Sequence, residues 1–226
     1  MWKHLVIDNF FDSDDNQKLI NLIKNVNLNQ IKNDGNLVFG THLINDNINK
    51  NDLIKFQIKP DDIKNVFKEK INKDLISQLH KKYLKKIVGY LNELNPQKAS
   101  LFDSSEFRIA VQGKNYTYPY HVDTPKKILS TVIYMEPENN IGTLLSSSGK
   151  NDNTKEIEWK RNRALIFSRK NNLTWHSFKS DGKNVRITII FNLMSDSVKK
   201  VRLVEDGFIK YFFKKIFIKQ YETEKE

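Results

Sequence analysis

The segment VRITIIFNLM, residues 185–194, reads as a β-strand whose two faces differ. Successive side chains of a strand point to opposite faces. One face would carry Val185, Ile187, Ile189, Phe191 and Leu193. The other face would carry Arg186, Thr188, Ile190, Asn192 and Met194. A wholly apolar face opposite an arginine and two further polar residues indicates a strand that separates a core from a cavity.

Two other segments after residue 104 alternate in the same way, EFRIAVQ (106–112) and KILSTVIYM (127–135), and RALIFS (163–168) is a further predicted strand. Turn-forming residues separate them, as in SSSGKNDN at 146–153. A run of short strands of this kind predicts a β-barrel or β-sandwich.

The first half of the chain is more helical. A short strand over 4–11 is followed by a helix for which Ser13 is the expected N-cap. A short strand is expected around NLVFGTHLI (36–44), and one or two helices between Pro60 and Pro96. The resulting prediction is an α+β, mainly β fold in which the helices pack on one side of the β core.

Length and composition bound the protein further. A chain of 226 residues can bury one sizeable core, so we expect a single domain over 1–226. It has no cysteine, which excludes disulfides and thiolate chemistry. The first residues carry charges within their apolar run, unlike a signal peptide, and no run is long enough to span a membrane. These features predict a soluble, cytoplasmic protein.

The net charge of +11 raises the question of an anionic partner. Arginine accounts for 6 of the 38 basic residues and lysine for the remainder. Phosphate-reading surfaces use more arginine, because the planar guanidinium matches phosphate geometry. The charge therefore gives no firm evidence for nucleic acid, and it mildly favours an anionic substrate.

A candidate metal site comes from HVD at 121–123 and from TWHSF at 174–178. In an extended strand, His121 and Asp123 would point the same way. Together with His176 they would form the two-histidine, one-carboxylate set that leaves coordination positions open on Fe(II). Each motif alone is weak, since an isolated histidine is more often structural. Arg186 strengthens the hypothesis, because a buried arginine needs an anion. An internal ion pair would satisfy Arg186 as well.

The order H-x-D, then His, then Arg ten residues later resembles the 2-oxoglutarate/Fe(II)-dependent oxygenases, in particular their prolyl-4-hydroxylase-like branch. The resemblance is good over residues 105–194 and fair over 1–26, and it is absent from 27–100 and from the C-terminal tail. It departs from the branch at 141–143, where the chain has IGT in place of a double glycine.

The resemblance implies a double-stranded β-helix (jelly-roll) core over 105–195, with an N-terminal strand and supporting helices over 1–104 and a C-terminal extension over 196–226. It implies that His121, Asp123 and His176 are the catalytic metal ligands for Fe(II). It also implies that Arg186 binds the far carboxylate of 2-oxoglutarate, with contributions from Tyr134, Thr188 and Gln112. The implied reaction uses O2, releases succinate and CO2, and hydroxylates a substrate C–H bond.

Other functions stay open at this point. One is a jelly roll that binds a metal or ligand without catalysis. A nucleic-acid-binding module and a hydrolytic zinc site are two more. The substrate, a small molecule or a peptide, is not determined, although Tyr116, Tyr118, Tyr120, Trp159 and Lys126 or Lys127 are candidates for its entrance. The tail FIKYFFKKIFIK (208–219) suggests core packing or a homodimer contact, and less readily a membrane-surface helix.

Overall fold

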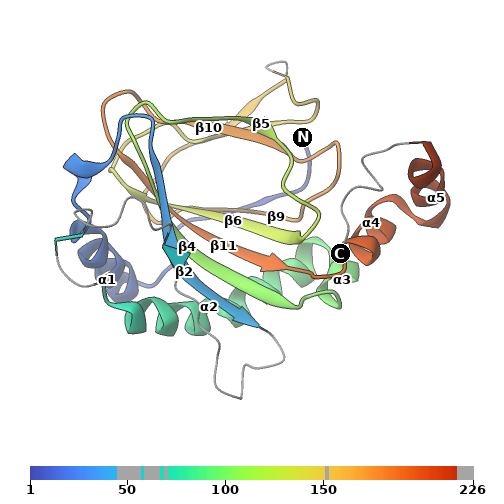
Figure 1. Ribbon diagram of the computed structural model, residues 1–226, viewed down its shortest axis with the longest axis horizontal. Coiled ribbons are helices and arrows are strands. Elements are labelled where there is room, and N and C mark those ends of the chain that lie inside the picture. The colour runs from blue at the N-terminus through green and yellow to red at the C-terminus, as the bar shows by residue number, and fades with distance from the viewer. Residues whose placement is uncertain (45–56, 59–66, 69–70, 151–152, 218–226) are drawn as a thin grey trace.

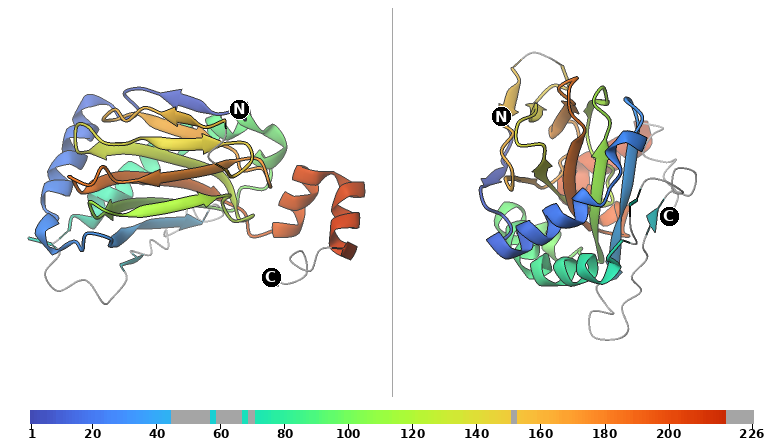
Figure 2. Two further views of the ribbon diagram at one scale, coloured as in Figure 1. Left: turned by 90° about the horizontal axis from the view of Figure 1, so that it is seen from above. Right: turned by 90° about the vertical axis from the view of Figure 1, so that its left-hand side faces the viewer.

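The structure, a computed structural model, describes residues 1–44, 57–58, 67–68, 71–150 and 153–217. The strands of these residues form two antiparallel sheets that face each other (Figures 1 and 2). The larger sheet has the strand order β1-β9-β6-β11-β4-β2-β3, and the smaller has the order β5-β10-β7-β8. The predicted jelly-roll core, with helices on one side, is confirmed.

The alternating segments of the sequence all lie in the larger sheet. The larger sheet consists of β1 (Leu5–Ile7), β2 (Asn36–Ile44), β3 (Gln57–Ile58), β4 (Ser104–Gln112), β6 (Lys127–Glu136), β9 (Ala164–Phe167) and β11 (Arg186–Met194). The smaller sheet consists of β5 (Thr117–His121), β7 (Thr143–Ser146), β8 (Lys155–Ile157) and β10 (Trp175–Lys179).

Strand β11 lies at the centre of the larger sheet, between β4 and β6. Its side chains Ile187, Ile189, Phe191 and Leu193 belong to the main hydrophobic core. The opposite face of β11 points into the space between the two sheets, where Ile190 and Asn192 line a cavity. The two-faced character predicted for this strand is therefore confirmed.

The helices α1 (Ser13–Lys24), α2 (Lys73–Leu94) and α3 (Pro96–Ala99) cover the outer face of the larger sheet (Figure 1). In α2, buried residues recur every three or four positions and pack on the sheet: Ile76, Leu79, His80, Tyr83, Leu84, Ile87 and Leu91. This spacing produces one apolar stripe along the helix. The helices thereby close the core from outside and leave the inner face of the sheet for the site.

Two details of the predicted helices differ from the structure. The N-cap of α1 is Asp12, whose carboxylate accepts a hydrogen bond from the Asp15 amide at 2.9 Å, and Ser13 is the first helical residue. Aspartate and serine are comparably effective at the N-cap, because the side-chain oxygen of either can accept this hydrogen bond. The second helix begins at Lys73, capped by Asn72, so Phe67 and Ile71 precede it. The earlier part of that prediction, at 61–66, lies outside the described residues.

The chain continues after β11 into α4 (Val198–Asp206) and α5 (Phe208–Phe217). Both helices project beyond the sheets, at the right of Figure 1. Gly207 connects them with a positive φ of 73°, a conformation that glycine adopts without strain. None of the described helices combines the length and the apolar character needed to cross a bilayer.

Candidate metal centre

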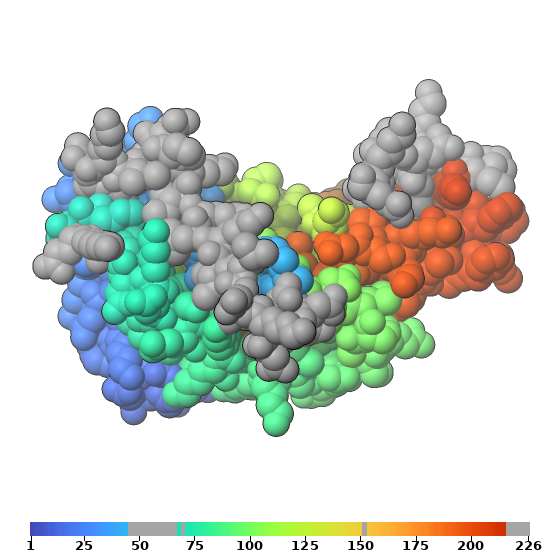
Figure 3. Space-filling view, turned by 60° about the horizontal axis from the view of Figure 1, so that its bottom comes forward, coloured from blue at the N-terminus to red at the C-terminus, as the bar shows by residue number. Residues whose placement is uncertain are grey.

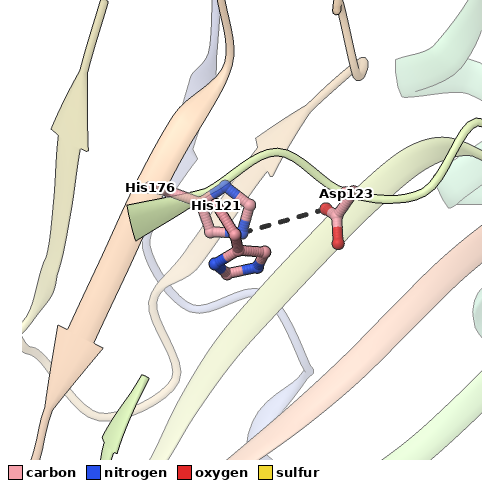
Figure 4. Close-up of side chains that lie close together, drawn as sticks. All are labelled: His121, Asp123 and His176. Atoms are coloured by element: carbon pink, nitrogen blue, oxygen red, sulfur yellow. Dashed lines mark ion pairs between the residues drawn. The ribbon is translucent and has the colours of Figure 1, made fainter. Parts of the chain in front are cut away.

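His121, Asp123 and His176 meet in the space between the two sheets (Figure 4). His121 ends β5 and is the register partner of His176 in β10. Their imidazole centroids are 4.1 Å apart. Asp123 lies just beyond β5, and its Oδ2 is 3.8 Å from His176 Nε2. One ligand atom from each residue lies within 4.8 Å of the other two. Residues 55 positions apart in sequence thus form one cluster because β5 pairs with β10.

Both imidazoles are oriented by the main chain. His121 Nδ1 lies 3.0 Å from the carbonyl oxygen of Pro119, and His176 Nδ1 lies 3.1 Å from that of Thr174. A carbonyl only accepts hydrogen bonds, so Nδ1 carries the proton and Nε2 keeps its lone pair. Burial lowers the pKa of His121, and it lowers that of His176 to about 4. Both rings are therefore neutral at physiological pH, as metal ligation requires.

The carboxylate of Asp123 is buried but stays ionised. Burial on its own would raise the pKa of Asp123, but nearby Lys127 and His176, with hydrogen bonds from Lys127 and Ser130, hold it well below its usual range. Lys127 Nζ lies 2.6 Å from Oδ1, and the Ser130 hydroxyl donates to Oδ2 at 2.6 Å. The site therefore presents a charged oxygen ligand whose orientation is set on both sides.

A buried ionic cluster supports the loop that carries Asp123. Arg169 Nε donates a hydrogen bond of 2.8 Å to the main-chain carbonyl of Asp123. The Arg169 guanidinium also pairs with Glu205 of α4, and Lys98 of α3 pairs with the same carboxylate at 2.6 Å. We did not predict this cluster from the sequence. The only signal was Arg169 itself, one of few arginines in a lysine-rich chain.

Arg186 is the first residue of β11 and is 1 % exposed. Its Nη1 donates to Gln112 Oε1 at 3.0 Å, while Nε and Nη2 have no hydrogen-bond partner among the described residues. Its guanidinium carbon lies 4.3 Å from the ring centroid of Phe178 and 5.0 Å from that of Trp159. Burial lowers its pKa to about 10, so it remains charged at neutral pH. Within the described structure no carboxylate pairs with this cation.

The three other predicted cosubstrate residues surround Arg186. Gln112 faces it directly across the β4–β11 pair. Thr188 lies two residues along the same strand and is the register partner of Tyr134 in β6. The Tyr134 hydroxyl donates to Thr143 Oγ1 at 2.9 Å and accepts from the Thr143 amide at 3.1 Å. Tyr134 is therefore already bonded within the protein, whereas Arg186 offers two free donors.

A cavity of ≈ 190 Å³ contains the three candidate ligands. Its wall also includes Gln112, Lys127, Ser130 and Thr143. Gln112 and Thr143 connect it to Arg186 and Tyr134, which lie directly behind the wall. This volume is below the roughly 300–1,000 Å³ typical of sites for drug-sized ligands, so it suits a small one.

The aromatic residues expected at the entrance are only partly there. Tyr116 and Tyr118 line the cavity: Tyr118 stacks on Phe178 at a centroid distance of 5.6 Å, and Tyr116 lies tilted to the same ring at 6.0 Å. Trp159 does not line it: the indole is buried, stacks on Tyr134 at 4.6 Å and donates to the Pro137 carbonyl. Of the two lysines, Lys127 lines the cavity, where it pairs with Asp123.

The sequence matches no protein-family model and no curated protein. The fold, however, is similar to solved structures of oxygenases. A prolyl-4-hydroxylase from Pseudomonas putida aligns with a TM-score of 0.53 at 11 % identity, over 85 % of this chain and 92 % of that one. A prolyl hydroxylase from Trichoplax adhaerens, solved with a peptide fragment of a hypoxia-inducible factor, aligns with a TM-score of 0.52 at 15 % identity, over 88 % and 86 %.

A third similar structure is the dioxygenase for auxin oxidation 1 of Arabidopsis thaliana, solved with 2-oxoglutarate. It aligns with a TM-score of 0.53 at 14 % identity, over 86 % of this chain and 84 % of that one. These alignments span most of each molecule, so the likeness concerns the whole fold and not a single motif. The chain therefore has the jelly-roll fold found in 2-oxoglutarate/Fe(II) oxygenases, including prolyl hydroxylases.

Proposed function

We propose that this protein is an Fe(II)- and 2-oxoglutarate-dependent dioxygenase that hydroxylates an unactivated C–H bond. The observation that carries the proposal is the position of Arg186. This buried, unpaired cation lies directly behind the wall of the cavity that holds His121, Asp123 and His176. A buried charge without a partner is costly, so the site is built for an anion.

The donor set fits Fe(II). Two neutral imidazoles and one carboxylate are the facial set of non-haem Fe(II) oxygenases, and they leave positions open for other ligands. In a facial set the ligands occupy adjacent positions at roughly right angles, so atoms at about 2.1 Å from the metal lie about 3.0 Å from one another. His176 Nε2 and Asp123 Oδ2 are 3.8 Å apart and would need to close by about 0.8 Å. All three ligand atoms lie within 4.8 Å of one another, so every pair would need to close by no more than about 1.8 Å, which side-chain rotation can supply.

The surroundings of Arg186 fit one end of a dicarboxylate. Its two free donors, Nε and Nη2, can form a bidentate pair with a carboxylate. The Gln112 carbonyl holds Nη1 and thereby fixes the plane of the guanidinium. Phe178 and Trp159 cover its faces and exclude water, which strengthens a charge pair. We infer that Arg186 binds the carboxylate of 2-oxoglutarate that lies away from the metal, and that Gln112 and Thr188 shape this end of the site.

When bound, Fe(II), 2-oxoglutarate and O2 would supply the oxidation of the substrate C–H bond, with release of succinate and CO2. The protein's own residues hold and orient these groups. The main-chain carbonyls of Pro119 and Thr174 keep the protons of His121 and His176 on Nδ1. Lys127 and Ser130 keep Asp123 ionised and fix its direction. The two sheets enclose the site and keep the oxidising chemistry away from bulk water.

The substrate we propose is a small molecule or a peptide side chain that enters beside Tyr116 and Tyr118. The two charged residues of the cavity wall, Asp123 and Lys127, pair with each other, so the wall itself adds no net positive charge. The anionic substrate suggested by the overall charge thus gains no support from the described part of the site. Tyr118 lies 4.3 Å from the His121 ring, so a substrate near the metal would contact this tyrosine.

The test is an anaerobic titration of metal-free protein with Fe(II), with and without 2-oxoglutarate, that follows the visible charge-transfer band of the chelate. Wild type should develop the band only when both are present. His176→Ala should abolish it, whereas His4→Ala, a histidine outside the cavity, should retain it. Arg186→Lys should require more 2-oxoglutarate, since lysine keeps the charge but loses the planar fork.

Succinate release under air would then establish turnover, including the uncoupled turnover that needs no substrate. A band that forms without turnover would favour a protein that binds these ligands without catalysis. If no band forms at any concentration, the proposed function is wrong.

A further inference from the structure

Helix α5 carries a wide apolar face that points to solvent. Phe208, Ile209, Phe212 and Phe213 are 76, 72, 54 and 58 % exposed. At 100° per residue the directions of these four side chains span about 140° of the helix circumference. The larger hydrophobic side chains elsewhere in the described structure are mostly buried in two core clusters. A concentration of exposed aromatic residues on one short helix marks an interaction surface.

The opposite face of α5 is basic. Lys210 and Lys214 lie there beside Tyr211, Lys215 lies at the boundary with the apolar face, and the segment 208–217 contains no acidic residue. Lys214 Nζ lies 2.7 Å from Asp206 at the end of α4, and Lys210 Nζ lies 4.0 Å from it. One carboxylate is thus shared by two lysines. The helix therefore combines an apolar face with an excess of positive charge along its other side.

The position of α5 leaves this face accessible. Helix α5 stands away from the sheets and from α1 and α2, whereas α4 packs on the body of the protein through the buried Val201 (Figures 1 and 3). The buried ion pairs of Glu205 with Lys98 and Arg169 anchor α4 to the body of the protein. The anchor holds α5 out to one side, where a flat surface could reach it without meeting the sheets first.

We propose that α5 is an interfacial helix with which the protein docks on an anionic lipid surface. Aromatic and aliphatic side chains on one face and lysines on the other are the pattern of helices that lie in the plane of a bilayer. Lysine stems extend along the apolar boundary while their ammonium groups reach the headgroups. The net charge of +11 would attract the whole protein to an anionic surface before the helix inserts.

A second copy of the chain fits this face less well. The four exposed side chains offer on the order of 500 Å² if each large apolar side chain has about 200 Å². A stable interface needs about 800 Å² from each partner. Pairing of two such helices would also bring two lysine-rich segments together, which costs energy, whereas an anionic headgroup layer neutralises them.

The test is flotation of the full-length protein with vesicles. One set is pure phosphatidylcholine, and the other contains three parts in ten of phosphatidylglycerol. We expect at least tenfold more protein on the anionic vesicles. Phe212→Ser with Phe213→Ser should reduce this binding at least tenfold, and Lys210→Gln with Lys215→Gln should reduce it severalfold. Lys81→Gln with Lys85→Gln, on the exposed side of α2, removes the same charge elsewhere and should change binding less than twofold.

Three results would overturn the proposal. One is equal binding of wild type to both vesicles or to neither. Another is a loss of vesicle binding in the Lys81/Lys85 variant that equals the loss in the Lys210/Lys215 variant, which would mean that net charge alone attracts the protein. The third is a dimer in light scattering that the Phe212/Phe213 variant loses while lipid binding is absent, which would assign the face to a second copy. The Fe(II)–2-oxoglutarate band should be the same in all these variants, so this test is independent of the proposed function.

Discussion

Arg169 donates a hydrogen bond from Nε to the main-chain carbonyl of Asp123 at 2.8 Å. The bond joins a candidate metal ligand to a residue 46 positions later, and Arg169 in turn pairs with Glu205 of α4. The position of the Asp123 carboxylate thus depends on a helix outside the jelly roll. Such outer contacts commonly change metal affinity 10- to 100-fold when they are removed.

Replacement of Arg169 should therefore weaken the metal site without changing any ligand. We expect Arg169→Met to reduce the affinity for Fe(II) or Co(II) at least tenfold, because the loop that carries Asp123 loses its anchor. Anaerobic metal titration of folded protein measures the effect. Lys170→Met, at the exposed neighbouring position, is the matched control and should bind as wild type does. A variant that is less stable but binds metal within twofold of wild type would show that Arg169 acts only on the fold.

The Glu205 carboxylate neutralises two buried cations, Lys98 and Arg169. Glu205→Gln leaves both without a negative partner and should lower the free energy of unfolding by about 3–5 kcal/mol. Urea denaturation at neutral pH measures this loss. Glu138→Gln, at an exposed position, changes the net charge equally and should cost less than about 0.5 kcal/mol. Similar losses in the two variants would argue against a structural role for the buried cluster.

The unpaired donors of Arg186 should make 2-oxoglutarate binding sensitive to this one residue. We expect Arg186→Met to weaken 2-oxoglutarate binding at least 30-fold, since removal of one partner from a buried charge pair costs 2–5 kcal/mol or more. Gln112→Met, which only frees the guanidinium plane, should have a smaller effect. Calorimetric titration with redox-inert Mn(II) as the metal gives both affinities. Binding of Mn(II) in the absence of 2-oxoglutarate should stay unchanged, and a parallel loss of both would contradict the assigned role.

A buried histidine far from the metal centre should make stability depend on pH. His80 of α2 lies between Thr41 Oγ1 at 2.7 Å and Ser105 Oγ at 2.8 Å, and burial lowers its pKa to about 3. In the unfolded chain its pKa would be near 6.5. Between about pH 3 and pH 6.5 this histidine is protonated in the unfolded chain but neutral in the folded protein. The stability that is present above pH 6.5 is therefore lost as the pH falls through this range.

From pH 7 to pH 5 this effect should remove about 2 kcal/mol from the free energy of unfolding. His80→Gln lacks the titrating group. Between pH 7 and pH 5 its free energy of unfolding should therefore fall by about 2 kcal/mol less than that of wild type. Because the variant keeps His121 and His176, their contribution cancels in the comparison. Chemical denaturation at the two pH values tests it, and identical losses in the two proteins would exclude His80 as the source.

The architecture of the β core could be predicted from sequence because its signals are local. Alternation in residues 106–112, 127–135 and 185–194 marks strands with one core face, and these segments correspond to β4, β6 and β11. Strand β10 has only five residues, and its sequence WHSFK does not alternate regularly between apolar and polar side chains, so it has no comparable pattern. The start of α2 was set by the Asn72 cap and not by the apolar residues before it.

The sequence by itself determined which residues could form the site, since H-x-D, a later histidine and an arginine ten residues beyond can be read directly from the chain. Only the tertiary structure decided that they meet. The pairing of β5 with β10 brings His121 to His176, and the β4–β11 register brings Gln112 to Arg186. It also decided the Lys98–Glu205–Arg169 cluster, whose members come from α3, α4 and the loop after β9. Charge pairs between distant segments leave no periodic trace in a sequence, because burial and register, not spacing, bring their atoms together.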